Sequence, residues 1–130
     1  MCIYLDDMRT PTEAGWIVAR NFDDFKNKIE LFGIENIQEI SFDHDLADFT
    51  RIDGISNEWT GFDAAKWLVE NYTNFEGTGY FDNPQNPFPK VNVHSNNPAG
   101  AKNIQTYLNN YLSFSGRLAN CTLNVLPHIV

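Results

Sequence analysis

The chain contains few residues that could crosslink it or bind a metal through sulfur. Its only two cysteines, Cys2 and Cys121, lie far apart and lack the spacing of metal ligands. This pattern argues against a disulfide framework and against a cysteine zinc site. A reduced, cytoplasmic compartment is therefore expected.

Basic side chains and long apolar runs are also scarce. Nine Lys and Arg stand against 17 Asp and Glu, for a formal net charge of -8. A surface that follows long duplex nucleic acid needs clustered cations, so no such partner is expected, although a metal could mediate contact with small anions. No basic leader precedes an apolar segment, and no apolar run is long enough to span a bilayer. A soluble protein without a membrane partner is predicted.

The apolar pattern predicts one α/β domain over residues 1–130. Strands and helices alternate, which is typical of a sheet with parallel strands and crossover helices. No helix fits between the first two strands, so the first crossover is missing or reduced. Strands are expected at residues 1–5, 16–19, 37–42, 91–94 and 121–126, and helices at residues 22–32, after Thr60 and after Asn97. The predicted fold is a receiver-like (flavodoxin-like) three-layer sandwich whose central, mostly parallel sheet has about five strands.

Each predicted helix has a recognisable start. Asn21 and Asn97 are capping residues, and Pro98 follows the second of these at the first helical position. Thr60 and Asp63 have the spacing of a capping box. Asp63 is therefore interpreted as a cap and not as a catalytic residue.

Two polar stretches are predicted to be loops. Residues 47–58 form one, which could cover a pocket as a flap. Residues 74–89 contain glycine and proline among Tyr80, Phe81 and Phe88, which is typical of a long irregular connection. This second loop is either a recognition loop or an insertion that folds onto its own aromatic side chains.

Three of the predicted strands end in side chains that can titrate, bind metal or bind anions. Ligands of open parallel sheets lie beyond the carboxyl ends of the strands. Strands that end in this way are therefore expected to converge on one pocket. The side chains are Asp6 and Asp7, then Asp43, His44 and Asp45, and finally His94, Ser95 and Asn96.

The acidic side chains at these strand ends are candidate metal ligands. Adjacent carboxylates repel each other unless a cation or strong donors lie between them. Oxygen ligands suit Mg²⁺, or another divalent cation such as Mn²⁺. Alternation places Asp43 and Asp45 on one face of the strand and His44 on the other, which favours Asp43 in the pocket. The predicted ligands are Asp6, Asp7, Asp43 and Asp45, and any single one could instead face solvent or cap a loop.

His94 is the best candidate for a general acid or base, because a histidine can take and return a proton near neutral pH. A hydrogen-bonded core histidine is the alternative. Ser95 and Asn96 precede a helix start that could bind an anion, and the helix start at Thr60 and Gly61 could do the same. Arg9 is well placed to hold a phosphate with two hydrogen bonds.

Four motifs resemble the cyclic-phosphate-processing receiver-like family. They are Leu5-Asp6-Asp7-Met8-Arg9-Thr10-Pro11, Ser41-Phe42-Asp43-His44-Asp45-Leu46, Thr60-Gly61-Phe62-Asp63 and His94-Ser95-Asn96-Asn97-Pro98-Ala99-Gly100. The resemblance implies a receiver-like domain that acts on cyclic phosphate ends of RNA or on nucleotides. It also implies residue roles: metal binding by Asp6, Asp7 and Asp43 with His44 and Asp45 beside them, phosphate binding by Arg9 and Thr60, and a strand-four motif of His94, Ser95 and Asn96.

Three functions follow as hypotheses. The first is a metal-dependent phosphoesterase that opens an RNA 2′,3′-cyclic phosphate end or a cyclic nucleotide signal, with His94, Asp43 and His44 as catalytic candidates. The second is a non-catalytic module that binds a nucleotide or a partner protein. The third is a degenerate signalling receiver phosphorylated on Asp43. It is disfavoured because Leu126-Pro127 stands where a receiver has lysine and proline.

Overall fold

A five-stranded parallel sheet forms the centre of the molecule in the computed structural model, which describes residues 1–124. The strand order is β2-β1-β3-β6-β7, as expected for a receiver-like fold. The strands are β1 (Cys2–Leu5), β2 (Trp16–Ala19), β3 (Glu39–Phe42), β6 (Lys90–Val93) and β7 (Thr122–Leu123). The predicted parallel sheet is confirmed. Positions 125 and 126 of the last predicted strand lie outside the described residues.

Three helices connect these strands, and each begins where its capping signal predicts. They are α1 (Phe22–Phe32), α2 (Gly61–Asn71) and α3 (Pro98–Phe114), with short 3-10 helices at Ile34–Asn36 and Tyr80–Asp82. The side chain of Asn21 accepts from the backbone N–H of Asp24 at 2.8 Å, and that of Asn97 accepts from Gly100 at 2.9 Å. These caps satisfy N–H groups that have no partner within the helix.

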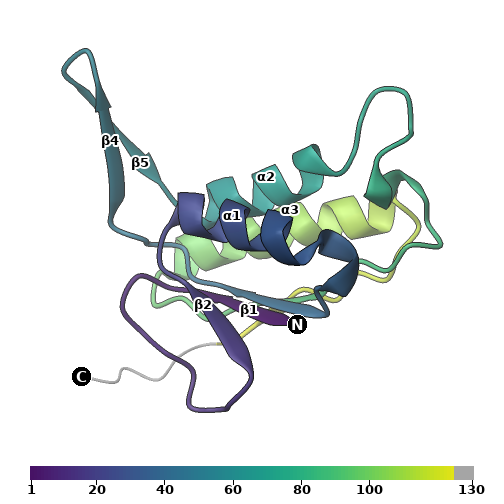
Figure 1. Cartoon of the computed structure of the whole chain (residues 1–130), viewed down its shortest axis with the longest axis horizontal. Coiled ribbons are helices and arrows are strands. Elements are labelled where there is room, and N and C mark those ends of the chain that lie inside the picture. Colours follow the sequence, from purple (N-terminus) through teal and green to yellow (C-terminus); the bar gives the residue numbers. More distant parts are fainter. Residues whose placement is uncertain (125–130) are drawn as a thin grey trace.

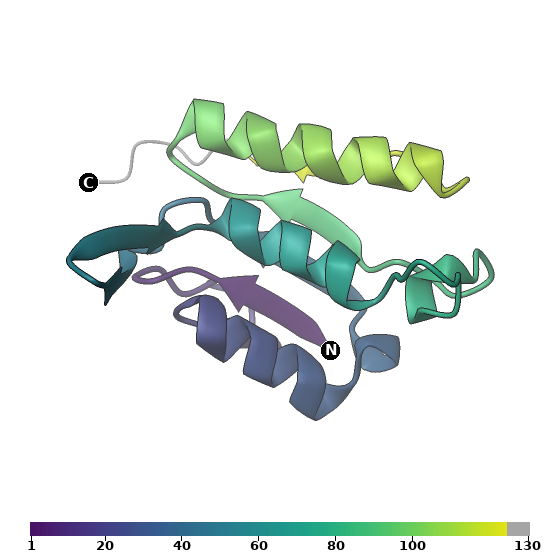
Figure 2. The same ribbon diagram turned by 90° about the horizontal axis from the view of Figure 1, so that it is seen from above.

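All three helices lie on the same side of the sheet (Figures 1 and 2). The connections through α1, α2 and α3 run in one direction across the strand order, whereas the β1–β2 connection runs in the other. Parallel crossovers are right-handed, so the β1–β2 connection belongs on the opposite face from the helices. That connection contains no helix. The receiver-like fold is confirmed, but the expected third layer has no helix among residues 1–124.

The two faces of the sheet differ in chemistry because of this layering. Residues under the helices are apolar and fully or almost fully buried: Ile3, Leu5, Ile40, Phe42, Val91 and Val93. The alternate residues on the other face include Tyr4, Ser41, Asn92 and His94. Within the described residues, the helices therefore cover the apolar face, and the face that carries these polar residues has no helix over it (Figures 1 and 2).

A β-hairpin replaces the loop predicted at residues 47–58. Strands β4 (Asp48–Ile52) and β5 (Ile55–Trp59) pair antiparallel and extend away from the body of the domain (Figure 1). Asp53 and Gly54 form the turn with φ of 53° and 78°, and Asp-Gly is a strong signal for such a two-residue turn. The loop prediction is wrong because the polar composition of the segment obscured this signal.

The connection at residues 74–89 folds onto its own aromatic side chains. Phe81 is 1% exposed, and its ring lies 4.6 Å from that of Phe88 and 5.6 Å from that of Tyr72, centroid to centroid. Burial of these rings supports the packing interpretation of this segment. Across residues 1–124, none of the helices combines the length and the apolar character that a membrane crossing requires.

Candidate functional site

Three carboxylates meet at the carboxyl edge of the sheet. Asp6 and Asp7 follow β1, and Asp43 follows β3, the adjacent strand, in which Phe42 pairs with Leu5. One oxygen from each of the three carboxylates lies within 4.8 Å of the other two. The strand pairing therefore brings three of the four predicted metal ligands together.

Asp6 is fully buried, and both of its oxygens accept hydrogen bonds. Its Oδ1 accepts from the backbone N–H groups of Met8 at 2.8 Å and Arg9 at 2.7 Å. Its Oδ2 lies 3.0 Å from Nε2 of His94. Burial by itself raises the pKa of Asp6, but the hydrogen bonds from His94, Arg9 and Met8 outweigh it and hold this pKa below its ordinary value.

Asp43 is also buried, but its pKa moves in the other direction. Burial and the neighbouring charge of Asp6 raise the pKa of Asp43, against the opposing influence of Ser95, His94 and Arg9. The guanidinium of Arg9 lies between the two acids, with Nε 3.2 Å from Asp6 Oδ2 and Nη2 3.6 Å from Asp43 Oδ2. A cation thus already lies against this carboxylate pair.

His94 connects the carboxylates to polar residues on the face of the sheet opposite α1, α2 and α3, which we call the open face. Its ring stacks on that of Tyr4, with centroids 4.0 Å apart and planes at 12°. The Ser41 hydroxyl lies 2.6 Å from Nδ1 of His94 and 2.5 Å from Oδ1 of Asn92. The side chain of Asn92 donates to Glu39 at 3.0 Å. A continuous hydrogen-bonded chain therefore runs from Asp6 along the open face to Glu39.

Three residues of the site, Tyr4, Ser41 and Asn92, were not predicted from the sequence. The alternation of side chains along each strand indicates that they face the site. Ser41 lies two residues before Asp43, and Asn92 two residues before His94, so each shares a face with a predicted site residue. His94 proves to be a hydrogen-bonded buried histidine that also contacts the acidic cluster.

His44 and Asp45 form a separate pair beside the start of α3. Nδ1 of His44 lies 2.7 Å from Oδ1 of Asp45, and the side chain of Asn97 donates to the same oxygen at 3.3 Å. The His44 ring packs against Gly100, where any larger side chain would overlap it. Asp45 is not in the carboxylate cluster, and its side chain is 59% exposed. The structure thus places two of the predicted site residues outside the group around Asp6.

Thr60 and Gly61 hold the start of α2 against the strand end. The Thr60 side chain accepts from the backbone N–H of Phe62 at 3.2 Å, while Asp63 accepts from the Thr60 N–H at 2.8 Å, which completes the predicted capping box. The Gly61 N–H donates to the His44 carbonyl at 2.8 Å. A side chain at Gly61 would overlap the Asp43 carbonyl. In this structure Thr60 caps the start of α2, and Gly61 contacts the backbone next to Asp43.

The oxygen-rich cluster suits a hard divalent cation. Mg²⁺ and Mn²⁺ prefer carboxylate oxygens, often a few of them together with water and substrate phosphate. Asp6, Asp7 and Asp43 supply such oxygens, and the contact of Arg9 with two of them shows that the arrangement accommodates positive charge. The residues present therefore fit the predicted metal.

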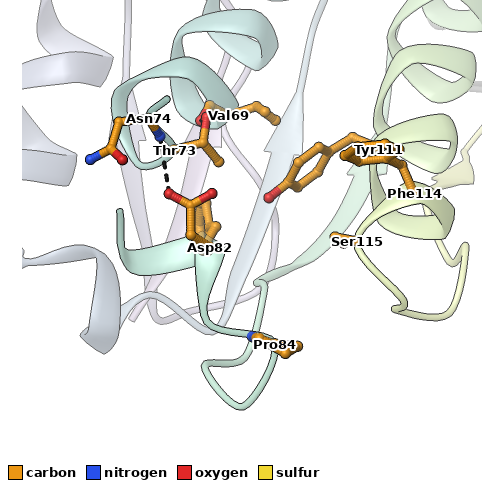
Figure 3. A pocket seen from close by; sticks show the side chains of 9 residues that line it. Val69, Thr73, Asn74, Asp82, Pro84, Tyr111, Phe114 and Ser115 are labelled. Atoms are coloured by element: carbon orange, nitrogen blue, oxygen red, sulfur yellow. Dashed lines mark hydrogen bonds between the residues drawn. The ribbon is translucent and has the colours of Figure 1, made fainter. Parts of the chain in front are cut away.

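Among the described residues, one cavity adjoins the site and another lies away from it. One of about 950 Å³ lies along the open face of the sheet and includes Arg9, His94 and Asn96 in its lining. The other, of about 500 Å³, lies among the carboxyl-terminal ends of α2 and α3 and the segment 74–89 (Figure 3). In Figure 3, Asp82 accepts from the backbone N–H of Asn74, at 3.0 Å. The lining of this second cavity includes none of the predicted site residues.

Comparison with known protein families gives a match that spans most of the chain. The model of the cyclic-phosphate processing receiver domain matches residues 1–110, which include every candidate site residue. No curated protein and no solved structure gives a significant match. The match covers most of the chain, and the five-stranded parallel sheet is consistent with the receiver-like fold of this family. The chain therefore belongs to the family of cyclic-phosphate processing receiver domains.

Proposed function

We propose that this domain is a metal-dependent phosphoesterase that opens a cyclic phosphate to a monoester. The observation that carries the proposal is the convergence of four side chains at one edge of the sheet, those of Asp6, Asp43, His94 and Arg9. His94 and Arg9 both contact Asp6. Acids, an imidazole and a guanidinium are the groups that phosphoryl transfer needs for metal binding, proton transfer and charge stabilisation.

Asp6, Asp7 and Asp43 would hold the Mg²⁺ or Mn²⁺ ion. When bound, the metal would polarise the phosphoryl group. Asp6 is already fixed for this role, because two backbone N–H groups orient its Oδ1 and leave Oδ2 for other partners. The start of α2 holds the backbone beside Asp43, because the Gly61 N–H donates to the His44 carbonyl and Gly61 packs against the Asp43 carbonyl.

In the hydrolysis, the oxygen of a water molecule would form the new bond to phosphorus as the ring P–O bond breaks, and His94 would give a proton from Nε2 to the ring oxygen that leaves. The Ser41 hydroxyl has one proton, which it can donate to Asn92 or to Nδ1 of His94. The Ser41 oxygen can therefore accept a hydrogen bond from Nδ1 when His94 is charged, and the hydroxyl can donate one to Nδ1 when His94 is neutral. Arg9, with Ser95 and Asn96, would bind the non-bridging oxygens, since Arg9 and Asn96 line the adjoining cavity with His94.

The test is turnover of a panel of substrates with and without a chelator. The panel contains nucleoside 2′,3′-cyclic phosphates, cyclic dinucleotides and RNA with a cyclic phosphate end. We expect metal-dependent formation of a monoester, with a rate at least 100-fold lower in His94→Gln. The matched control is Phe114→Ala, at an exposed position in the other cavity. A folded protein that binds the metal but converts none of these compounds would contradict the proposal.

A second candidate is a module that binds a nucleotide without converting it. The observation that favours it is that both nitrogens of His94 already have hydrogen-bond partners, Asp6 and Ser41. Calorimetry would then show tight binding in wild type and in His94→Gln, and chromatography would recover the ligand unchanged from both.

A further inference from the structure

The cavity on the open face of the sheet extends well beyond the residues that the proposed chemistry uses. Its volume is about 950 Å³, within the range of small-molecule sites. Arg9, His94 and Asn96 lie at the end nearest the acidic cluster. Several other lining residues have no role in the proposed reaction, among them Tyr4, Trp16, Glu39, Lys90 and Asn124.

The remaining lining combines aromatic rings with hydrogen-bonding groups. Trp16 and Tyr4 come from the two adjacent strands β2 and β1, and their rings meet edge to face with centroids 5.8 Å apart. Glu39 and Lys90 are cross-strand partners on β3 and β6. A ligand matched to these walls has a flat apolar surface and a polar edge, which is the chemistry of a nucleobase.

The length of the cavity also fits a nucleotide. Glu39 lies four residues before Asp43 along β3, which corresponds to about 13 Å in an extended strand. Arg9 contacts Asp43, so a phosphate held by Arg9 would lie at the other end of this span from Glu39. A nucleoside can bridge that separation, whereas a small sugar phosphate would leave Glu39 and Lys90 without contact.

We infer that this cavity seats the nucleoside of the substrate and that Glu39 and Lys90 select guanine. The inference rests on the proposed function, since it assigns the phosphate to the neighbouring acidic site. A carboxylate only accepts hydrogen bonds and an ammonium only donates them. Guanine presents two adjacent N–H donors beside a carbonyl acceptor, so it satisfies Glu39 with two bonds and Lys90 with one. Adenine and cytosine each offer the carboxylate a single amino group.

The test uses binding of stable monoesters, so that it does not depend on turnover. Calorimetry in the presence of Mg²⁺ compares guanosine 3′-monophosphate, adenosine 3′-monophosphate and ribose 5-phosphate. We expect the guanosine compound to bind at least tenfold more tightly than either of the others. Glu39→Gln should remove most of the preference for guanine, and Trp16→Leu should weaken both nucleotides. Phe114→Ala, in the other cavity, is the control.

Folding of each variant is checked by circular dichroism. If Trp16→Leu does not fold, Lys90→Ala at an exposed position replaces it, with a predicted loss of guanosine binding. Equal affinity for the three compounds, or for the two nucleotides, overturns the inference even if the protein opens cyclic phosphates. Guanosine binding that depends on Glu39, without any turnover, supports the inference and rejects the proposed function.

The same measurement identifies the source of the nucleotide. An oligonucleotide that ends in guanosine 3′-monophosphate is compared with the free nucleotide. Tighter binding of the oligonucleotide supports an RNA end as the ligand, and equal binding supports a free nucleotide. Failure of both to bind more tightly than ribose 5-phosphate overturns the inference.

Discussion

The guanidinium of Arg9 lies 3.2 Å from the carboxylate of Asp6, which is fully buried. Arg9 also approaches Asp43, at 3.6 Å, and its side chain is 37% exposed. A partly exposed cation therefore screens two buried acids from each other. Because these acids are also the predicted metal ligands, Arg9 and the metal compete for the same negative charge.

Replacement of Arg9 by glutamine should therefore change metal and phosphate binding in opposite directions. We expect Arg9→Gln to bind Mg²⁺ several-fold more tightly, because the carboxylates lose a competing cation. We expect its affinity for a nucleoside monophosphate to fall at least tenfold, because a two-pronged donor is lost. Calorimetric titrations of the metal and of the nucleotide measure the two effects separately. Arg51→Gln, on the exposed hairpin, is the matched control. Metal affinity that stays the same or falls would contradict the assigned competition.

Metal binding should weaken as the pH falls towards the raised pKa of Asp43. Burial, together with the charge of Asp6, raises this pKa, so Asp43 takes up a proton at a higher pH than an ordinary aspartate. A carboxylate must be deprotonated to bind a metal, so binding of Mg²⁺ at a pH near the pKa of Asp43 releases a proton from Asp43. We expect calorimetry between pH 4 and 7 to show an affinity that rises with pH and levels off above the pKa of Asp43. In Asp43→Asn this dependence should be smaller, and an unchanged dependence would assign it to another group.

The contact between His44 and Gly100 predicts a pair of coupled substitutions. Helix propensity by itself favours alanine over glycine at position 100 by about 1 kcal/mol. The added methyl group would overlap the His44 ring, however, and overpacking of this kind costs about 1–3 kcal/mol. We expect Gly100→Ala to lower the free energy of unfolding, and His44→Ala to relieve most of that loss in the double variant.

Gly61→Ala provides the contrast, because its methyl group would overlap the backbone carbonyl of Asp43 and not the end of a side chain. His44→Ala should leave this loss unrelieved. Urea denaturation of the single and double variants measures the free energy of unfolding of each. A Gly100→Ala variant as stable as wild type would contradict the packing of His44 against α3.

Cys121 should be unreactive in the folded protein. Burial raises the pKa of its thiol to about 12, and the residue is 3% exposed. Alkylation at pH 8 should therefore modify Cys2, which is partly exposed, before Cys121. Unfolding in urea should make both thiols react, and mass spectrometry of the peptides distinguishes them. Rapid native modification of Cys121 would contradict its burial.

The same thiol links stability to alkaline pH. Between about pH 9 and the folded pKa of about 12, the folded state keeps a proton that the unfolded state loses. The stabilising contribution of the neutral thiol is thus complete below pH 9 and is lost as the pH rises. We expect the free energy of unfolding to fall more steeply from pH 9 to 10 in wild type than in Cys121→Ala.

Local signals in the sequence account for most of the elements. Asn21, Thr60 and Asn97 mark the starts of three helices because each cap depends on residues within three positions of itself. Alternation and strand ends likewise placed Asp6 and Asp43 at one edge, since β1 and β3 are neighbours in the sheet. The hairpin at β4 and β5 was missed, although its Asp53-Gly54 turn is equally local.

The sequence by itself determined the order of the strands and helices and the charged residues that end the strands, because periodicity and capping act over a few residues. Only the tertiary structure decided that α1, α2 and α3 cover one face and that the other face carries a cavity lined by both aromatic and polar side chains. It also decided that His94 contacts Asp6 across 88 positions of the chain and that His44 turns away from this cluster. These relationships depend on crossover handedness and side-chain packing between distant segments, which no local pattern encodes.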